Sequence, residues 1–347
     1  MAFTDDWLAL TTEETLEPDL KICDPHHHLW DAGFDPSAKF RSEQVEGRYL
    51  LDEILAEVNS GHNVTSTVFI ECMSMYRADG LAHLRPVGET EFVNGIAAMS
   101  ASGRYGPCRI AAGIVGLTDM NLGSGAREVL EAHISAGAGR FRGIRHAASW
   151  DASDDIRNSH TKPTQHMLAD AKFREGIAQL APLNLSFEAW CYHPQIPDAT
   201  DLAQAFPDTT IILNHFGGPL GIGPYAGKRE ETFAQWRLDI TNLAKCQNVV
   251  AKLGGINMRV NGFDWDLGEK PPSSEELAAA TRAYYDHCIE VFGPDRCMFE
   301  SNFPVDKRTC SYNVLWNTFK RIASGCSSSE KAALFHDTAA RVYRLDS

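Results

Sequence analysis

The chain has 347 residues, of which 44% are hydrophobic and 22% are charged, and these ordinary proportions exclude a chain dominated by disorder. Its 46 acidic residues outnumber 32 basic ones, and the formal net charge of −14 makes nucleic acid and anionic membranes poor partners. The expected partner is a small-molecule substrate.

The N-terminal sequence MAFTDDWLAL lacks the basic flank and apolar core of a signal peptide, and no apolar run reaches 18 residues. We therefore expect a cytoplasmic protein. The nine cysteines are scattered and include no CxxC pair, which predicts reduced, mostly buried thiols rather than a zinc knuckle. A homodimer is the default expectation for the assembly.

Eight short apolar runs, each followed by a longer stretch of helical period, predict eight βα units. The runs are LKIC (20–23), STVFIE (66–71), RIAAGIVG (109–116), FRGIRH (141–146), LSFEAW (185–190), TTIILN (209–214), NVVAKL (248–253) and CMFES (297–301). The helices expected between them include 50–58, 89–99, 126–135 and 274–292. This alternation predicts one α/β domain over residues 1–347, a (β/α)8 TIM-like barrel with residues 1–19 as an N-terminal extension.

Three segments rich in glycine and proline follow proposed strands, at 193–200, 215–230 and 261–276. They predict long loops over the top face of the barrel, where they could wall a pocket.

A barrel of this kind builds its active site at the C-terminal ends of its strands, so polar residues just after each run are the candidates. These residues are His26, His28, Glu71, Arg145, His146, Glu188, His193, His215, Lys252 and the group from Glu300 to Asp306.

Three consecutive histidines follow the first run, in DPHHHLWD (24–31). Side chains alternate along a strand, so His26 and His28 share one face while His27 takes the other. Two imidazoles on one face can bind one ion, with His215 after the sixth run as a third ligand. Alternatively, the histidines form a hydrogen-bonded structural cluster anchored by the neighbouring aspartates.

Five motifs in chain order resemble the amidohydrolase superfamily, in particular its branch of sugar-lactone and 2-pyrone-4,6-dicarboxylate lactonases. The motifs are DPHHHLWD (24–31), FRGIRH (141–146), ILNHFGGP (212–219), NVVAKLGG (248–255) and MFESNFPVD (298–306). The resemblance implies a distorted (β/α)8 barrel that hydrolyses C–O or C–N bonds, with members of the branch acting on lactone rings. It also implies that His26, His28 and His215 line the centre of the site.

The chain departs from this family where the last strand ends. The family usually has an aspartate there, in a sequence like GSDWP, whereas this chain reads ESNFP and has Asn302 in that place. An amide is no general base near neutral pH, although its oxygen can accept a hydrogen bond. Candidates for a replacement base, each of which could instead pair with a nearby cation, are Glu300, Asp306, Glu71, Glu188 and His193.

The leading hypothesis is hydrolysis of a small ring ester or related carbonyl compound. One divalent ion, zinc or manganese, or the histidine cluster without a metal, would polarise the carbonyl. Cations at strand ends favour an anionic substrate, unless they form structural ion pairs, and nearby aromatic residues suit a ring-shaped one. We assign catalysis to His26, His28, His215, Asn302, Glu300, Arg145 and His146, and substrate binding to Arg145, Lys252, His193, Glu188 and Trp190.

Two other readings remain open. One is metal-dependent, non-oxidative decarboxylation of an aromatic acid, against which Asn302 argues. The other is a catalytically degenerate barrel that only binds a ligand, against which the retention of His26, His28 and His215 argues.

Overall fold

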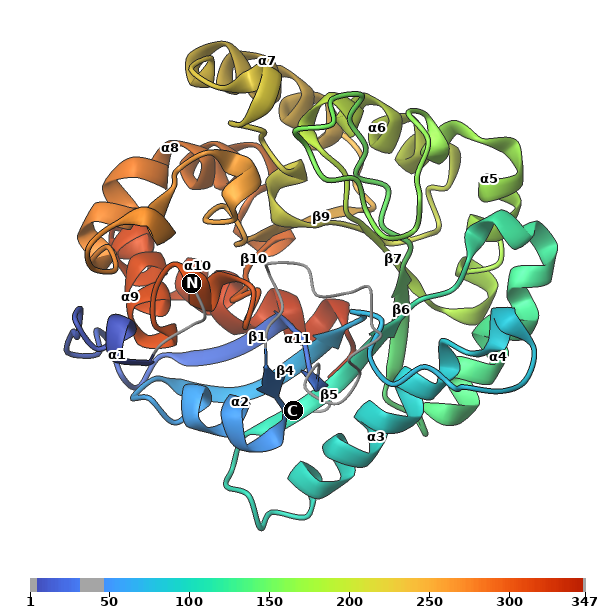
Figure 1. Cartoon of the computed structure of the whole chain (residues 1–347), viewed down its shortest axis with the longest axis horizontal. Helices are drawn as coiled ribbons and strands as arrows, with labels where there is room; N and C mark the ends of the chain where they lie inside the picture. Colours follow the sequence, from blue (N-terminus) through green and yellow to red (C-terminus); the bar gives the residue numbers. More distant parts are fainter. Residues whose placement is uncertain (1–4, 32–46, 346–347) are drawn as a thin grey trace.

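The computed structural model describes residues 5–31 and 47–345. Eight parallel strands follow one another around a single sheet in chain order, and helices form a ring outside them (Figure 1). The strands are β1 (Lys21–His27), β4 (Asn63–Ile70), β5 (Arg109–Gly116), β6 (Phe141–Arg145), β7 (Ser186–Ala189), β8 (Ile211–Leu213), β9 (Val249–Leu253) and β10 (Cys297–Phe299).

Backbone hydrogen bonds just beyond β10 join the two ends of this sheet. The amide of Asn302 donates to the carbonyl of His26 at 2.9 Å, and the amide of His28 donates to the carbonyl of Phe303 at 2.8 Å. The sheet therefore forms a barrel, and the predicted (β/α)8 fold is confirmed.

The helices on the outside occupy the stretches of helical period between strands. They are α2 (Leu51–Val58), α3 (Val87–Ala101), α4 (Ala126–Ala136), α5 (Ala171–Ile177), α6 (Ile196–Ala205), α7 (Arg229–Leu243), α8 (Ser274–Phe292) and α9 (Tyr312–Ile322). Shorter elements are α1 (Asp5–Leu8), α10 (Ser328–Ala332), α11 (Thr338–Val342) and an antiparallel pair of β2 (Trp30–Asp31) and β3 (Arg48–Tyr49). Within residues 5–31 and 47–345, no helix has the length and apolar character needed to cross a membrane.

The loop predicted over 193–200 is wrong in its second half, because α6 begins at Ile196 directly after a 3-10 turn over His193–Gln195. Pro194 and Pro197 lie at the starts of these two helical segments. Proline is well tolerated in the first turn, where its missing N–H has no intrahelical acceptor. The prolines that indicated a loop therefore mark the start of a helix.

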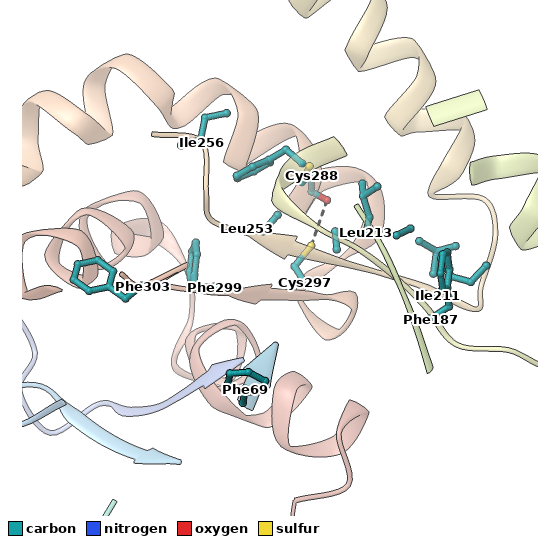
Figure 2. Packing of buried hydrophobic residues seen from close by; sticks show 14 of the residues in the cluster. Phe69, Phe187, Ile211, Leu213, Leu253, Ile256, Cys288, Cys297, Phe299 and Phe303 are labelled. Atoms are coloured by element: carbon teal, nitrogen blue, oxygen red, sulfur yellow. Dashed lines mark hydrogen bonds between the residues drawn. The ribbon is translucent and has the colours of Figure 1, made fainter. Parts of the chain in front are cut away.

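The main apolar core lies between the strands and the surrounding helices. Figure 2 shows part of it, where Cys297 of β10 donates a hydrogen bond from Sγ to the carbonyl of Cys288 in α8 at 3.6 Å. All nine cysteines are free thiols, and seven of them are buried.

A second, smaller core lies inside the barrel, around the C-terminal end of the chain (Figure 1). Ala339, Val342 and Tyr343, from the C-terminal end of the chain, pack there against inward-facing residues of the strands. The strand residues are Cys23, Val68, Ile70, Val115, Ile212, Val250 and Met298. This plug leaves the C-terminal ends of the strands as the end of the barrel where a site can open.

Candidate active site

Three buried side chains from three strand ends converge at this end of the barrel: His26 from β1, His215 just after β8 and Glu300 just after β10. Oε2 of Glu300 lies 2.6 Å from Nδ1 of His26, and Oε1 lies 2.6 Å from Nδ1 of His215. One donor atom from each residue falls within 4.8 Å of the others. The carboxylate therefore bridges two imidazoles.

Two glycines after β9 leave room for this cluster. A Cβ on Gly255 would lie 2.4 Å from Nδ1 of His215, and a Cβ on Gly254 would lie 2.4 Å from Cγ of Glu300. Gly255 also has a φ of 69°, which L-residues with a side chain rarely adopt. The GG in the motif after β9 is thus required by the close approach of the two catalytic candidates.

The histidine triplet alternates around the strand as expected. The rings of His26 and His28 meet edge to face with centroids 5.0 Å apart, whereas Nε2 of His27 lies 2.9 Å from the hydroxyl of Thr67. Nδ1 of His28 donates to the carbonyl of Ile70 at 2.8 Å, an assignment of the ring proton that leaves a lone pair on Nε2. His27 is structural.

A buried ion pair lies beneath the cluster. Nζ of Lys252 is 2.9 Å from Oε2 of Glu188, 3.4 Å from Nδ1 of His26 and 4.0 Å from Oε2 of Glu300. Tyr343 donates a hydrogen bond from the barrel plug to the other oxygen of Glu188. Lys252 and Glu188 form a charged layer under the site and do not belong to the described lining of the cavity, and the substrate binding expected of them stays a prediction.

Arg145 joins β6 to the neighbouring strand ends. Its Nε donates to Oε1 of Glu71 at 2.8 Å, and its Nη1 lies 3.3 Å from Nε2 of His26. The other oxygen of Glu71 lies 3.5 Å from Nε2 of His160. The ion pair that the sequence left open for Arg145 therefore exists, while its guanidinium still reaches the site.

Burial and charge set the protonation of these groups. Burial, together with Lys252, holds the pKa of His26 well below its usual value, and burial with Arg145 does the same for the pKa of His215. Burial raises the pKa of Glu300 to about 8, against the opposing effect of Lys252. Near neutral pH the two imidazoles are uncharged, and Glu300 can hold a proton.

A cavity of about 210 Å³ opens over the cluster. Arg145, His28, His215 and Asn302 reach its surface, with the indole of Trp190 among its apolar walls. Further polar lining comes from the loop between β6 and α5, through Ser149, Arg157, Asn158, Ser159 and His160. Among the described residues that line the cavity there are two arginines and three histidines and no carboxylate.

Two predicted site residues hold loops instead. Nδ1 of His146 accepts a hydrogen bond from the amide of Met120 at 3.0 Å, and Nδ1 of His193 accepts one from the amide of Leu220 at 3.2 Å. Neither histidine belongs to the described lining of the cavity. The catalytic role expected for His146 and the binding role expected for His193 stay predictions, and the structure places both residues outside this lining.

Asn302 lies at the cavity, with its backbone at a φ of 54° and its Nδ2 donating to Oδ1 of Asp306 at 3.0 Å. Asp306 is buried and is not part of the described cavity lining. The residue that replaces the family aspartate therefore holds a buried carboxyl group behind the described lining of the cavity.

The converging donors suit a divalent ion. Imidazole nitrogen and carboxylate oxygen are ligands of both zinc and manganese. Oε2 of Glu300 makes no hydrogen bond with the described residues, although it lies close to His26, so a buried acceptor remains for a cation. Compared with the expected trio of His26, His28 and His215, the structure brings Glu300 into the donor set and places His28 beside it.

Residues 23–345 match the family model described as Amidohydrolase. The chain belongs to the amidohydrolase family. This amidohydrolase is 33% identical over 337 residues to an uncharacterized protein, y4mH, of Sinorhizobium fredii, covering 94% of this chain and 99% of that one. It is 30% identical over 239 residues to the L-fucono-1,5-lactonase of Burkholderia multivorans, covering 68% and 72% of the two chains. The family assignment identifies an enzyme of the hydrolase class.

Solved structures share the barrel of this amidohydrolase. An amidohydrolase from Burkholderia multivorans with bound zinc has a TM-score of 0.68 and 24% identity, covering 94% of this chain and 99% of that one. A protein from Pseudomonas putida assigned as a 2-pyrone-4,6-dicarboxylic acid hydrolase has a TM-score of 0.63 and 18% identity, covering 94% of this chain and 99% of that one. The 5-carboxyvanillate decarboxylase from Sphingomonas paucimobilis has a TM-score of 0.57 and 14% identity, covering 94% of this chain and 100% of that one. These likenesses show the fold alone.

Proposed function

We propose that the chain hydrolyses a lactone whose ring carries a carboxylate or another anionic group. The observation that carries this proposal is the charge of the cavity. In a protein with a net charge of −14, the described lining presents Arg145 and Arg157 and no acidic side chain. Kinship with a lactonase at 30% identity supports the ring ester as the reacting group.

The two arginines of the cavity have different roles, one in substrate binding and one in charge stabilisation. Arg157 lies at the exposed side of the cavity, where a guanidinium can hold a carboxylate through two parallel hydrogen bonds. Arg145 is fixed by Glu71 and lies deeper, beside His26, where it can stabilise the negative charge that develops on the carbonyl oxygen. Attack by water then breaks the ring C–O bond and gives a hydroxy acid.

We further propose that His26, His215 and Glu300 hold one zinc or manganese ion. Such an ion would supply Lewis-acid polarisation of the substrate carbonyl. The positive charges of Lys252 and Arg145 beside His26 oppose a divalent cation, so the site should bind it less tightly than an equal donor set without them.

The substrate proposal is tested with six-membered lactones in matched pairs, with and without a ring carboxylate. We expect turnover of the carboxylated member, and an increase of roughly tenfold in its KM in Arg157→Gln, because one ionic contact is worth about 1.4 kcal/mol here. Lys172→Gln is the control, since this exposed lysine pairs with Glu175 on the surface. Equal rates on both members, with no effect of Arg157→Gln, would contradict the anionic substrate. Release of carbon dioxide in place of ring opening would contradict hydrolysis.

The metal proposal is tested by elemental analysis before and after chelation. We expect up to one equivalent of zinc or manganese, removal by a moderate chelator, and loss of at least about tenfold in kcat that returns when the ion is restored. Full activity in the metal-free protein would overturn the metal and leave the lactonase proposal standing.

A further inference from the structure

The replacement of the family aspartate by Asn302 leaves the attacking water without an evident base. We propose that His160, in the loop between β6 and α5, is the general base for this water. The proposal rests on the proposed lactone hydrolysis and assigns one catalytic residue to it.

The loop holds His160 at the cavity from both sides. The amide of Ser159 donates to the carbonyl of Ser149 at 3.0 Å, and the hydroxyl of Thr161 donates to the carbonyl of Ala147. Both acceptors follow directly on from β6. The side chain of His160 is 17% exposed and lines the cavity. An imidazole flanked by two anchored neighbours has the fixed placement that proton transfer needs.

A buried carboxylate faces the imidazole. Oε2 of Glu71 lies 3.5 Å from Nε2 of His160, while Oε1 is held by Arg145 at 2.8 Å. Burial alone would raise the pKa of Glu71, but Arg145 and His160 outweigh it and hold that pKa below its usual value. The carboxylate is therefore ionised, and it can orient the imidazole and stabilise the imidazolium ion. With Nε2 turned to Glu71, Nδ1 is the nitrogen that takes the proton.

The other ionisable groups near the site are engaged elsewhere. Glu300 lies between two imidazoles, Glu188 pairs with Lys252, and Asp306 is bound by the amide of Asn302. None of these three carboxyl groups belongs to the described lining of the cavity.

The two other histidines of the cavity are in a less favourable electrostatic position. His28 and His215 are almost fully buried near Arg145, so a proton on either would add positive charge beside a fixed cation. A proton on His160 instead adds positive charge beside the carboxylate of Glu71. The ionisable groups that interact with His160 include Glu71 and His146, and Arg145 holds the other oxygen of Glu71.

In the proposed step, His160 first accepts one proton and then returns it. Nδ1 of His160 takes a proton from water as the water oxygen forms a bond to the lactone carbonyl carbon, and the carbonyl π electrons move to its oxygen. When the tetrahedral intermediate collapses, the ring C–O bond breaks and the leaving alkoxide takes the proton from the imidazolium. The imidazole is regenerated, and one water has been added to the ring ester.

The test compares His160→Gln with His166→Gln on the lactone that the wild type turns over best. His166 is a matched control because it lies on the same loop, is 66% exposed and pairs with Asp198 at the surface. We expect kcat to fall by about 10²–10⁴-fold in His160→Gln with KM changed less than about threefold, and no change in the control. Added imidazole should restore part of the rate of His160→Ala, which a merely structural role would not allow.

Three results would overturn the inference. Wild-type kcat in a folded His160→Gln would exclude the base, and a raised KM at unchanged kcat would make His160 a binding residue only. Absence of imidazole rescue in His160→Ala would also count against it. If the wild type opens no lactone, the proposed function itself is wrong, and so is the base assignment. The other three results differ from this one because each requires a wild type that opens a lactone.

Discussion

At the scale of single residues, Lys252 balances the charge inside the barrel. Its ammonium group is fully buried between Glu188, at 2.9 Å, and the carboxylate of Glu300, at 4.0 Å. Glu188 also accepts hydrogen bonds from Asn214 and Tyr343. A buried ion pair of this kind is costly to assemble, and removing one partner is costlier still because the other charge is left in a medium of low polarity.

Replacing Lys252 by methionine should therefore destabilise the fold by about 3–5 kcal/mol, because the carboxylate of Glu188 would lose its counter-ion. The double variant Lys252→Met with Glu188→Gln should recover most of that loss, since the uncompensated charge is removed. Urea denaturation of the two variants and the wild type measures both values. A free energy of unfolding of Lys252→Met less than about 1 kcal/mol below that of the wild type would show that the ion pair contributes little to stability.

The residue types at the strand ends could be predicted from the sequence, but their pairing could not. His26, His28 and His215 follow from strand alternation and barrel geometry. The bridge from Glu300 to two histidines, and the pairing of Arg145 with Glu71, depend on distances across the barrel that the sequence does not contain. His160 was missed because it lies deep in a loop rather than at a strand end, although that loop is long and polar.

At the scale of elements, the turn after β9 controls the placement of His215. Gly255→Ala would bring a Cβ to 2.4 Å from Nδ1 of His215 and would also strain a backbone at φ 69°. Gly103→Ala, just after α3, also strains a backbone at positive φ, here 75°, with no described atom within 4 Å of its Cβ. Comparing the two variants separates the effect of backbone strain from that of the contact between the new Cβ and His215.

We expect both alanine variants to lose roughly 1–2 kcal/mol of stability from strain. Only Gly255→Ala should lower kcat/KM as well, by about 10²-fold, because a displacement of about 1 Å in a catalytic group has this effect. Steady-state kinetics beside thermal unfolding measures the difference. Equal activities of the two variants would mean that His215 does not need its observed position.

The contact between α3, α4 and the end of β5 predicts a pH dependence of stability. His133 of α4 accepts a hydrogen bond from Thr90 of α3 at 2.7 Å and donates to the carbonyl of Leu117 at 2.9 Å. Burial lowers its pKa from 6.5 to about 4. Between these two values the unfolded chain takes up a proton that the folded chain does not, so stability is lost as the pH falls from 6.5 to 4 and is unaffected above 6.5.

The loss from His133 should approach about 1.4 kcal/mol for each pH unit in that interval. In His133→Gln the slope of unfolding free energy against pH should be smaller by about this amount, whatever the absolute stability of the variant. His166→Gln, at an exposed position, is the control. Denaturant unfolding at several pH values from 4 to 8 measures the slopes, and identical slopes in His133→Gln and wild type would exclude this contribution.

Most elements of the barrel could be predicted because each is periodic over its whole length. The run at 109–116 and the helix at 274–292 coincide with β5 and α8. The start of α6 could not be predicted, because prolines and glycines mark both loops and helix ends. In the structure Ile196, the first residue of α6, is buried.

At the scale of the whole molecule, the C-terminal end of the chain completes the barrel and touches the charged layer under the site. Val342 and Tyr343 fill the lower part of the barrel, and the phenol of Tyr343 donates to Glu188. The active-site layer and the plug are therefore one continuous packed column, with Glu188 and Lys252 between them.

Tyr343→Phe keeps the packing and removes only the hydrogen bond to a buried carboxylate, so we expect a loss of about 1–3 kcal/mol. Tyr225→Phe is the matched control, because its phenol donates to Asp151 at 3.0 Å on a more exposed part of the chain, where less than about 1 kcal/mol should be lost. Chemical denaturation measures the free energy of unfolding of both variants and of the wild type. Equal losses of stability would show that the hydrogen bond from Tyr343 to Glu188 contributes no more than one near the surface.

The most direct test of the central claim is the fate of solvent oxygen during turnover of a carboxylated six-membered lactone in ¹⁸O-labelled water. Hydrolysis at this site predicts an opened hydroxy acid that carries one ¹⁸O atom in its new carboxylate, no carbon dioxide, and loss of the product in a folded His215→Gln. A product lighter by carbon dioxide, or no labelled product from the wild type across the lactone panel, would contradict it.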